Sequence, residues 1–240
     1  MDGLCHCVRP DLQKLGEDLY CLSCGYASLG KTENQHFKPE GPGNTVIHLT
    51  GRAKFHYRPL QSPHALRLVH LYAGHRKDEI RCRIFHATLE DHPVFEALSY
   101  TWGDSILSHE IYSDEGTVRV TANCASALRD LRHTSRDRFL WIDAICINQA
   151  SNAEKNHQVP LMNKIYAAAI RVVIYIGPDP ADDADRFFDY FRPHYLRPDS
   201  ACMAARKIVD QDHVSAFLSK SWFSRIWVLQ EVAVAREAVL

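Results

Sequence analysis

The chain lacks the features that mark membrane, secreted and nucleic-acid-binding proteins. No run among its 240 residues comes near the ~18 uninterrupted apolar residues of a membrane span. Its 28 Lys and Arg residues balance 29 Asp and Glu residues, so no basic field exists to attract nucleic acid or anionic lipid. The N-terminus has no apolar core of a secretory signal, and we therefore expect a cytoplasmic protein. The apolar content of 46% is that of an ordinary globular chain.

Cysteine is present, but its distribution does not favour disulfides. A cytoplasmic chain keeps its thiols reduced. Four cysteines stand singly among apolar neighbours, where a thiol packs as a small apolar group: Cys82, Cys124, Cys146 and Cys202. The other four form two close pairs near the N-terminus: Cys5, Cys7, Cys21 and Cys24.

These two N-terminal pairs leave two main interpretations open. Four thiolates are the ligand set of a tetrahedral structural Zn²⁺, and Cys21-x-x-Cys24-Gly25 has the spacing of a zinc knuckle. Cys5-x-Cys7 departs from that spacing, which equally fits reduced thiols in an N-terminal segment without metal. A redox role is a lesser alternative.

Residues 25–32, GYASLGKT, match the phosphate-loop pattern letter for letter. That chemistry needs a buried strand before the loop and a helix after it. The preceding segment holds Cys21 and Cys24, and Pro39 and Gly41 follow before two helical turns are complete. We therefore interpret the match as chance.

The chain divides into a Cys-rich segment (1–30), an irregular linker (31–64) and a regular region (65–240). Apolar alternation and apolar runs predict strands at 66–72, 80–85, 96–102, 109–112, 117–121, 139–147 and 171–176. Helical spacing predicts helices at 124–132, capped by Asn123, and at 153–169, capped by Asn152, then at 182–191, 206–219 and 222–238. This alternation predicts an α/β fold with a mixed, largely parallel central sheet covered by helices. The apolar end, 238–240, suggests the start of another strand and a chain that continues or is truncated.

Polar residues follow the ends of two predicted strands. Trp102, Gly103 and Asp104 end one strand, and Asn148 and Gln149 end the buried run 139–147. Sites in α/β sheets form beyond the carboxyl ends of parallel strands, so we expect these residues to line a pocket.

Asp143 interrupts the apolar run, and a buried carboxylate needs a cation or several donors. Arg225 is its expected partner, and Gln230-Glu231 form a polar pair in the apolar last helix. We expect an Asp143–Arg225 structural pair, with Glu231 nearer solvent beside Trp102 or Gln149.

Several segments resemble the fungal heterokaryon-incompatibility (HET) domain family, in the order the family has them over about residues 95–235. They are Ala97–Gly103, Asn123 with Ala127–Arg132, Leu140–Gln149, then Glu154, Gln158, Val159, Met162, Ile165, Tyr166 and Ala169, then Val173–Gly177 and Trp222–Glu231. Tyr175 and Ile176 stand where the family prefers Trp and Leu.

The resemblance implies a domain that triggers programmed cell death when genetically different fungal hyphae fuse. It also implies a distant, TIR-like similarity of fold; some TIR domains cleave NAD⁺ with a glutamate. Fold alone does not establish that activity here.

Two functions from different classes follow. The first is a signalling module that acts through protein partners or self-association, in which Asp143, Arg225 and Glu231 are structural. The second is a nucleotide or NAD glycohydrolase with Glu231 as the catalytic acid, Trp102 stacked on a base and Arg225 on a phosphate. A third, a Cys146–His157 hydrolase, fits poorly because Cys146 lies in an apolar run.

Overall fold

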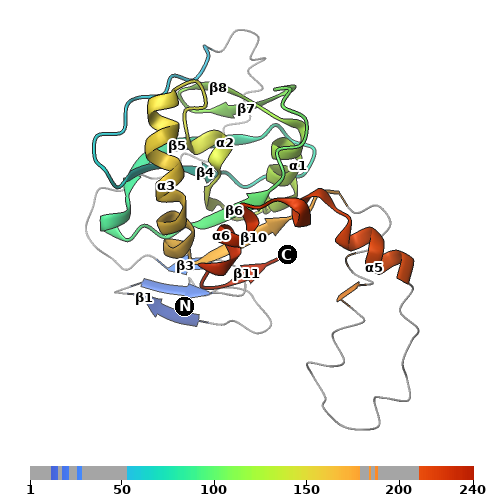
Figure 1. The fold of residues 1–240 in the computed structure, drawn as a ribbon. Helices are drawn as coiled ribbons and strands as arrows, with labels where there is room; N and C mark the ends of the chain where they lie inside the picture. Colours follow the sequence, from blue (N-terminus) through green and yellow to red (C-terminus); the bar gives the residue numbers. More distant parts are fainter. Residues whose placement is uncertain are drawn as a thin grey trace. The chain divides into compact units, whose positions relative to one another are not determined.

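The structure is a computed structural model that describes residues 53–178 and 211–240, three short N-terminal strands, and residues 184, 187 and 188 (Figure 1). The chain forms two compact units, Met1–Arg52 and Ala53–Leu240. The strands of the first unit are β1 (Leu12–Leu15), β2 (Asp18–Cys21) and β3 (Tyr26–Ser28), paired antiparallel in that order.

The zinc prediction lies outside what the structure describes, because Cys5, Cys7 and Cys24 are not among the described residues. Of Cys21 only the backbone is described, at the end of β2. Strand β3 lies inside the phosphate-loop pattern, where phosphate binding needs a loop, and this supports a chance match.

The second unit contains an eight-stranded mixed sheet in the order β11-β10-β6-β9-β4-β5-β7-β8. Neighbours β11, β10, β6 and β9 run parallel, as do β5 and β7, and the other pairs are antiparallel. This confirms the α/β class and the mixed, largely parallel sheet. The strands are β4 (Ala65–Leu71), β5 (Arg81–Thr88), β6 (Glu96–Tyr100), β7 (His109–Ser113), β8 (Gly116–Val120), β9 (Arg138–Trp141), β10 (Arg171–Tyr175) and β11 (Ala238–Val239).

The helices begin close to the predicted positions but use different caps. Helix α1 (Ala122–Leu131) is capped by Thr121, whose hydroxyl accepts from the Cys124 N–H, because the Asn123 amide instead donates to the Thr101 carbonyl. Helix α3 (Asn152–Ala168) is capped by Ser151. It packs on the central strands (Figure 1). There Tyr166 meets Trp141 edge to face at 5.4 Å, and its hydroxyl donates to the Leu98 carbonyl.

Two predicted elements are wrong in extent. The run 139–147 is not one strand: β9 ends at Trp141, and Asp143–Cys146 forms the single turn α2. The Asp143 carboxylate accepts from the Ala144 N–H at the start of this turn, while Ile145 and Cys146 stay buried. An apolar run alone does not distinguish a buried strand from a buried helical turn.

The predicted helix 222–238 is also divided. A 3₁₀ turn, η3 (Ser221–Ser224), is followed by extended backbone at Arg225, helix α6 (Val228–Ala233) and strand β11. Strand β11 pairs parallel with β10, as the apolar residues 238–240 suggested. Helix α5 (Gln211–Leu218) precedes η3, and the predicted helix 182–191 lies largely outside the described residues.

The second unit starts before the regular region that the sequence predicted. Phe55 is buried, its N–H donates to the Thr117 carbonyl, and Lys54 bridges to Thr117 beside the edge strand β8. Within the described part of the chain, no helix combines the length and apolar character needed to cross a membrane.

Candidate functional site

The carboxyl ends of β6, β9 and β10 lie at one edge of the sheet, because these neighbouring strands run parallel. Trp102 follows β6 and Asp143 follows β9, so the two side chains meet at that edge. The Trp102 indole N–H donates to the Asp143 carboxylate at 2.8 Å. Gln149 reaches the same place, and its amide donates to the Asp143 carbonyl at 2.9 Å. Trp102 and Gln149, both predicted for a strand-end site, thus converge on Asp143, which was expected inside a strand and paired with Arg225.

The turn after Trp102 is held tightly. Gly103 has a φ of 70°, and a Cβ there would lie 2.7 Å from the Asn123 amide nitrogen. That amide donates to the Thr101 carbonyl at 3.2 Å, so the loop is pinned to the start of α1. Only glycine fits this conformation and this approach without strain. Asp104 is exposed, and its carboxylate accepts from the Ile106 N–H at 3.3 Å.

Asp143 is partly open to solvent, and its carboxylate accepts from the Trp102 indole N–H and the Ala144 N–H. Burial raises the pKa of Asp143 to about 6, and the bonds from Trp102 and the Ala144 N–H offset only part of that effect. The charge of Glu231 raises the same pKa further, and that of Arg225 lowers it. Asp143 is therefore a carboxyl group that changes charge near neutral pH, the property that acid–base chemistry requires.

Glu231 lies in the core behind this edge, with 2% of the residue exposed. Its carboxylate accepts from the Ser99 hydroxyl, and the Trp222 indole N–H donates to the same hydroxyl at 2.8 Å. Arg225 Nη2 lies 3.3 Å from the other carboxylate oxygen. The η3–α6 segment is thus tied to β6 through polar bonds.

Two sequence-based expectations about these residues are wrong. Arg225 pairs with Glu231 rather than with Asp143, and Glu231 is buried rather than close to solvent. Both errors come from the assumption of one continuous helix from 222 to 238. Extended backbone at Arg225 separates η3 from α6, which turns Glu231 inward and brings it back to the arginine.

The remaining predicted residues are dispersed. Gln230 is exposed. Asn148 caps the turn before α3, where its side chain accepts from the Ala150 N–H at 3.1 Å. Cys146 is fully buried, which raises the pKa of its thiol to about 12, so the structure gives no support to a cysteine hydrolase.

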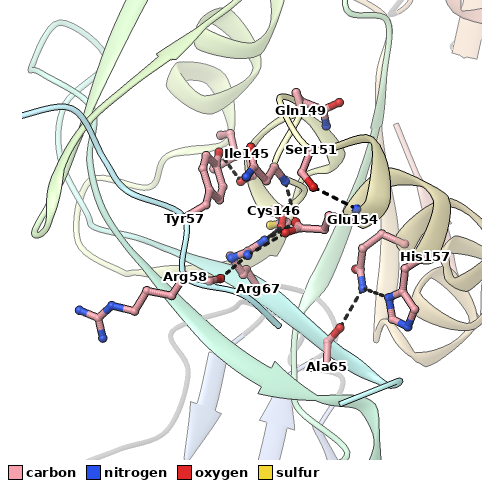
Figure 2. A network of polar contacts seen from close by, with 12 residues as sticks. Tyr57, Arg58, Ala65, Arg67, Ile145, Cys146, Gln149, Ser151, Glu154 and His157 are labelled. Carbon is pink, nitrogen blue, oxygen red and sulfur yellow. Dashed lines mark hydrogen bonds and ion pairs between the residues drawn. The ribbon is translucent and has the colours of Figure 1, made fainter. Parts of the chain in front are cut away.

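Sequence reasoning missed a second polar cluster, centred on Arg67 of β4 and Glu154 of α3 (Figure 2). The two side chains form a two-pronged ion pair, with Nη1–Oε1 at 2.5 Å and Nη2–Oε2 at 3.1 Å. The guanidinium also donates to the carbonyls of Cys146 (2.9 Å) and Arg58 (2.6 Å). Tyr57 lies against it, with Arg67 Cζ 5.0 Å from the ring centre.

This cluster holds the segment that leads from α2 into α3. Glu154 accepts from the Asn148 N–H at 2.7 Å, and the Tyr57 hydroxyl donates to the Ile145 carbonyl at 2.9 Å. Burial opposes ionisation of Glu154, but the bonds from Arg67 and Asn148 outweigh it and lower its pKa. An arginine inside the apolar strand β4 was the available signal, equivalent to Asp143 in its own apolar run.

Among the residues whose side chains are described, no group of three or more His, Cys, Asp or Glu is placed to hold a metal ion. The polar groups at the carboxyl ends of the strands are the carboxylate of Asp143, the indole of Trp102 and the amide of Gln149. The Arg67 cluster fixes the neighbouring backbone from Ile145 to Asn148.

The fold and the strand-end residues define an α/β domain of the kind that the motifs suggested, and comparison with known proteins identifies the family. The profile described as heterokaryon incompatibility protein (HET) matches residues 95–231. The chain belongs to this family.

A curated relative is "Heterokaryon incompatibility protein 6, OR allele" of Neurospora crassa, 31% identical over 221 residues. The match covers 72% of this chain and 32% of the relative, so the chain spans about a third of that protein's length. No solved structure matches the chain.

Proposed function

We propose that the chain is a heterokaryon-incompatibility-type effector module, which triggers programmed cell death on non-self recognition in a filamentous fungus. The observation that carries this proposal is the family match over residues 95–231, together with the name of the relative from Neurospora crassa. The module acts in the cytoplasm through protein partners or self-association.

The geometry around Glu231 supports a module that needs no active site. The carboxylate is buried and engaged by Ser99 and Arg225, which is the arrangement of a structural tie. In this proposal the motif Trp222–Glu231 serves to fix the C-terminal segment on the sheet.

Inducible expression of the chain in a filamentous fungus tests this proposal. We expect loss of hyphal viability on induction. The control is Arg58→Ala, which changes an exposed side chain paired at the surface with Glu115 and should kill equally. The proposal is contradicted if hyphae that express the wild type, at the same protein level as the Arg58→Ala control, remain viable.

A second candidate is a nucleotide or NAD glycohydrolase, with NAD as substrate. The observation that favours it is Asp143, a partly open carboxyl group with a pKa of about 6, bonded to Trp102 at the carboxyl edge of parallel strands. Here Trp102 stacks on the base and Gln149 lines the pocket. Glu231, proposed from sequence as the catalytic acid, lies behind this edge and acts on Asp143 through its charge.

NAD⁺ consumption by purified protein tests the second candidate independently of cell killing. We expect turnover by the wild type, strong loss in Asp143→Asn and partial loss in Glu231→Gln. Absence of turnover by folded wild-type protein removes this candidate and leaves the first in place.

A structural zinc ion on Cys5, Cys7, Cys21 and Cys24 also remains a proposal. Metal analysis of freshly purified protein should find about one zinc per chain, and Cys21→Ser with Cys24→Ser should abolish it. Zinc-free protein contradicts this site.

A further inference from the structure

The loop between α1 and β9 gathers hydrogen-bond donors around one histidine ring. The Ser135 N–H donates to Nδ1 of His133 at 3.1 Å, and the Ser135 hydroxyl oxygen lies 3.2 Å from the same nitrogen. At the other ring nitrogen, Nη2 of Arg136 lies 3.3 Å from Nε2 of His133. The second amino group of Arg136, Nη1, is buried and has no hydrogen-bond partner in the part of the chain that the structure describes.

No protonation state of His133 provides an acceptor for both of its neighbours. The Ser135 N–H and the Arg136 guanidinium can only donate. If the neutral ring carries its proton on Nε2, that N–H faces the Arg136 donor, and if it carries the proton on Nδ1, that N–H faces the Ser135 N–H. The protonated ring faces a donor at both nitrogens. At least one donor therefore points at another donor in every state, so the loop lacks an acceptor.

The carboxylates of the same stretch do not supply this acceptor. Between residues 129 and 138 the acidic residues are Asp130 and Asp137. Asp130 pairs with Arg76, and Asp137 pairs with His70 at 2.7 Å. Both carboxylates are thus engaged by other side chains, and none among the described residues contacts the guanidinium of Arg136.

Two further arginines add positive charge beside this loop. Arg132 is buried, and its guanidinium donates to three backbone carbonyls between residues 75 and 79, which carry no net charge. Burial lowers the pKa of Arg132, and the charge of Arg129 lowers it further, although Asp78 opposes this. An anion at the loop would therefore meet a positive potential as well as unpaired donors.

The backbone of the loop is also fixed. The Gly74 N–H donates to the His133 carbonyl at 3.0 Å. A Cβ at position 74 would lie 3.3 Å from Nη1 of Arg132, so the two loops approach closely. The donors are therefore presented from a held backbone, which reduces the ordering cost of binding a ligand.

We propose that His133, Ser135 and Arg136 form a binding site for a phosphoryl group. Ionised phosphate oxygens accept hydrogen bonds, and arginine is suited to them because its donors form a fixed fork. A phosphoryl group presents three such oxygens, which can satisfy the imidazole, the hydroxyl and the guanidinium together. The inference goes beyond the proposed function and does not depend on it.

A phosphate titration of the purified full chain, followed by the NMR signals of the histidine rings at constant pH, tests the site. We expect a saturable shift of the His133 signal, which His133→Gln identifies by its loss, and a much smaller shift with acetate at the same ionic strength. His64, an exposed histidine beside Glu90, is the internal control and should not saturate. Absence of a saturable His133 shift overturns the proposal. Equal saturation by phosphate and acetate means an adventitious ion only and also overturns it.

Two variants test the donors separately. Arg136→Gln should weaken phosphate binding at least tenfold, because a charge-assisted bond is lost. Ser135→Ala should weaken it about threefold, and because Ser135 is exposed, this variant gives a result even if Arg136→Gln fails to fold. The matched control is Arg58→Gln, which removes one positive charge from an exposed side chain and should bind phosphate as the wild type does. If Arg58→Gln weakens binding as much as Arg136→Gln, the effect is one of net charge and the proposed site is wrong.

A comparison of inorganic phosphate with glycerol phosphate identifies the source of the phosphoryl group. Tighter binding of glycerol phosphate supports a phosphorylated small molecule as the ligand. Equal or tighter binding of inorganic phosphate supports the free ion.

Discussion

Two buried ion pairs fix the chain beside the strand-end site, and they are built in opposite ways. In the Arg67–Glu154 pair the cation is the more deeply buried member, with side-chain exposures of 1% and 12%. In the Arg225–Glu231 pair it is the carboxylate, with exposures of 20% and 2%. The first pair has two short contacts, and the second has one at 3.3 Å.

The difference lies in how completely each arginine is satisfied. Both Nη atoms of Arg67 donate to a carboxylate oxygen and to a backbone carbonyl. Nη1 of Arg225 is buried without a hydrogen-bond partner in the part of the chain that the structure describes. Nε of Arg67 is likewise buried without a partner there, so neither guanidinium is saturated. Arg67 nevertheless donates four hydrogen bonds to described residues and Arg225 donates one, which makes the Arg67 pair the more extensively bonded of the two.

The largest expected effect is from Arg67→Ala. It removes the cation paired with the half-buried carboxylate of Glu154, which keeps only the Asn148 N–H, and it removes the donor to the carbonyls of Cys146 and Arg58. The free energy of unfolding should therefore fall by about 5 kcal/mol. Urea unfolding measures this. Arg58→Ala is the control, because its side chain is exposed and only its carbonyl joins the cluster, so it should cost less than about 1 kcal/mol. Equal effects of the two substitutions contradict the comparison.

Arg225→Ala should cost less than Arg67→Ala, about 3 kcal/mol, because one contact is lost while a carboxylate is left buried. Glu231→Gln keeps the shape and an acceptor for Ser99, and should cost about 1–2 kcal/mol. The same urea measurements apply. If Arg225→Ala destabilises the protein more than Arg67→Ala, the ranking of the two pairs is wrong.

Asp143 at the strand ends and Glu154 in the Arg67 cluster should change the stability of the protein with pH in opposite directions. The pKa of Asp143 is raised from 3.8 to about 6, so the folded state binds more protons than the unfolded state between these values. The contribution of Asp143 to the free energy of unfolding is therefore greatest below pH ~4, and it decreases by up to about 2–3 kcal/mol as pH rises through 6. Asp143→Asn should remove that decrease when unfolding is measured from pH 4.5 to 7.

Glu154 has a lowered pKa, so its contribution is present at neutral pH and is lost as pH falls below its ordinary value. Glu154→Gln should abolish that acid loss and leave the decrease due to Asp143 in place. If both substitutions alter the same limb of the stability–pH curve, the assignment of opposite signs is incorrect.

Small effects are also expected from alanine at two glycines, of which Gly103 lies in the turn beside Asp143. Alanine at position 103 would have to adopt a positive φ, and its Cβ would clash with the Asn123 amide. Gly103→Ala should therefore lower the free energy of unfolding by about 2 kcal/mol. Gly177→Ala shares the positive φ, at 97°, but has nothing within 4 Å of its Cβ, so it should cost about 1 kcal/mol. Thermal unfolding separates the two. If the two substitutions lower the stability equally, the close contact with Asn123 contributes nothing to the effect.

Strands and helices marked by apolar periodicity or by turn residues within the segment itself were predictable from the sequence. Strand β6, the β7–β8 hairpin around Glu115-Gly116, and helices α1 and α3 lie within a few residues of their predicted ranges. Each has an apolar period or a turn residue that acts over neighbouring positions. The rule that parallel strands end at one edge predicted that Trp102 and Gln149 lie close together, but not that Asp143 joins them, because Asp143 was expected inside a strand.

The partners of the buried charges were not predictable in this way. Arg225 was paired with Asp143 because both lie in apolar surroundings, yet the structure joins it to Glu231. Arg67 was not identified at all, although it closes a cluster that spans from β4 to α3. An ion pair depends on distances of a few ångströms between segments far apart in the chain, which no local pattern encodes.

By itself the sequence determined the α/β class, the order of most strands and helices, and the family, because these rest on periodicity and on motifs read in chain order. Only the tertiary structure decided where each charge goes. The break at Arg225 turned Glu231 into the core and left Ile226 and Leu229 outside, because the Ser99 hydroxyl and Arg225 offered the donors that a buried carboxylate requires.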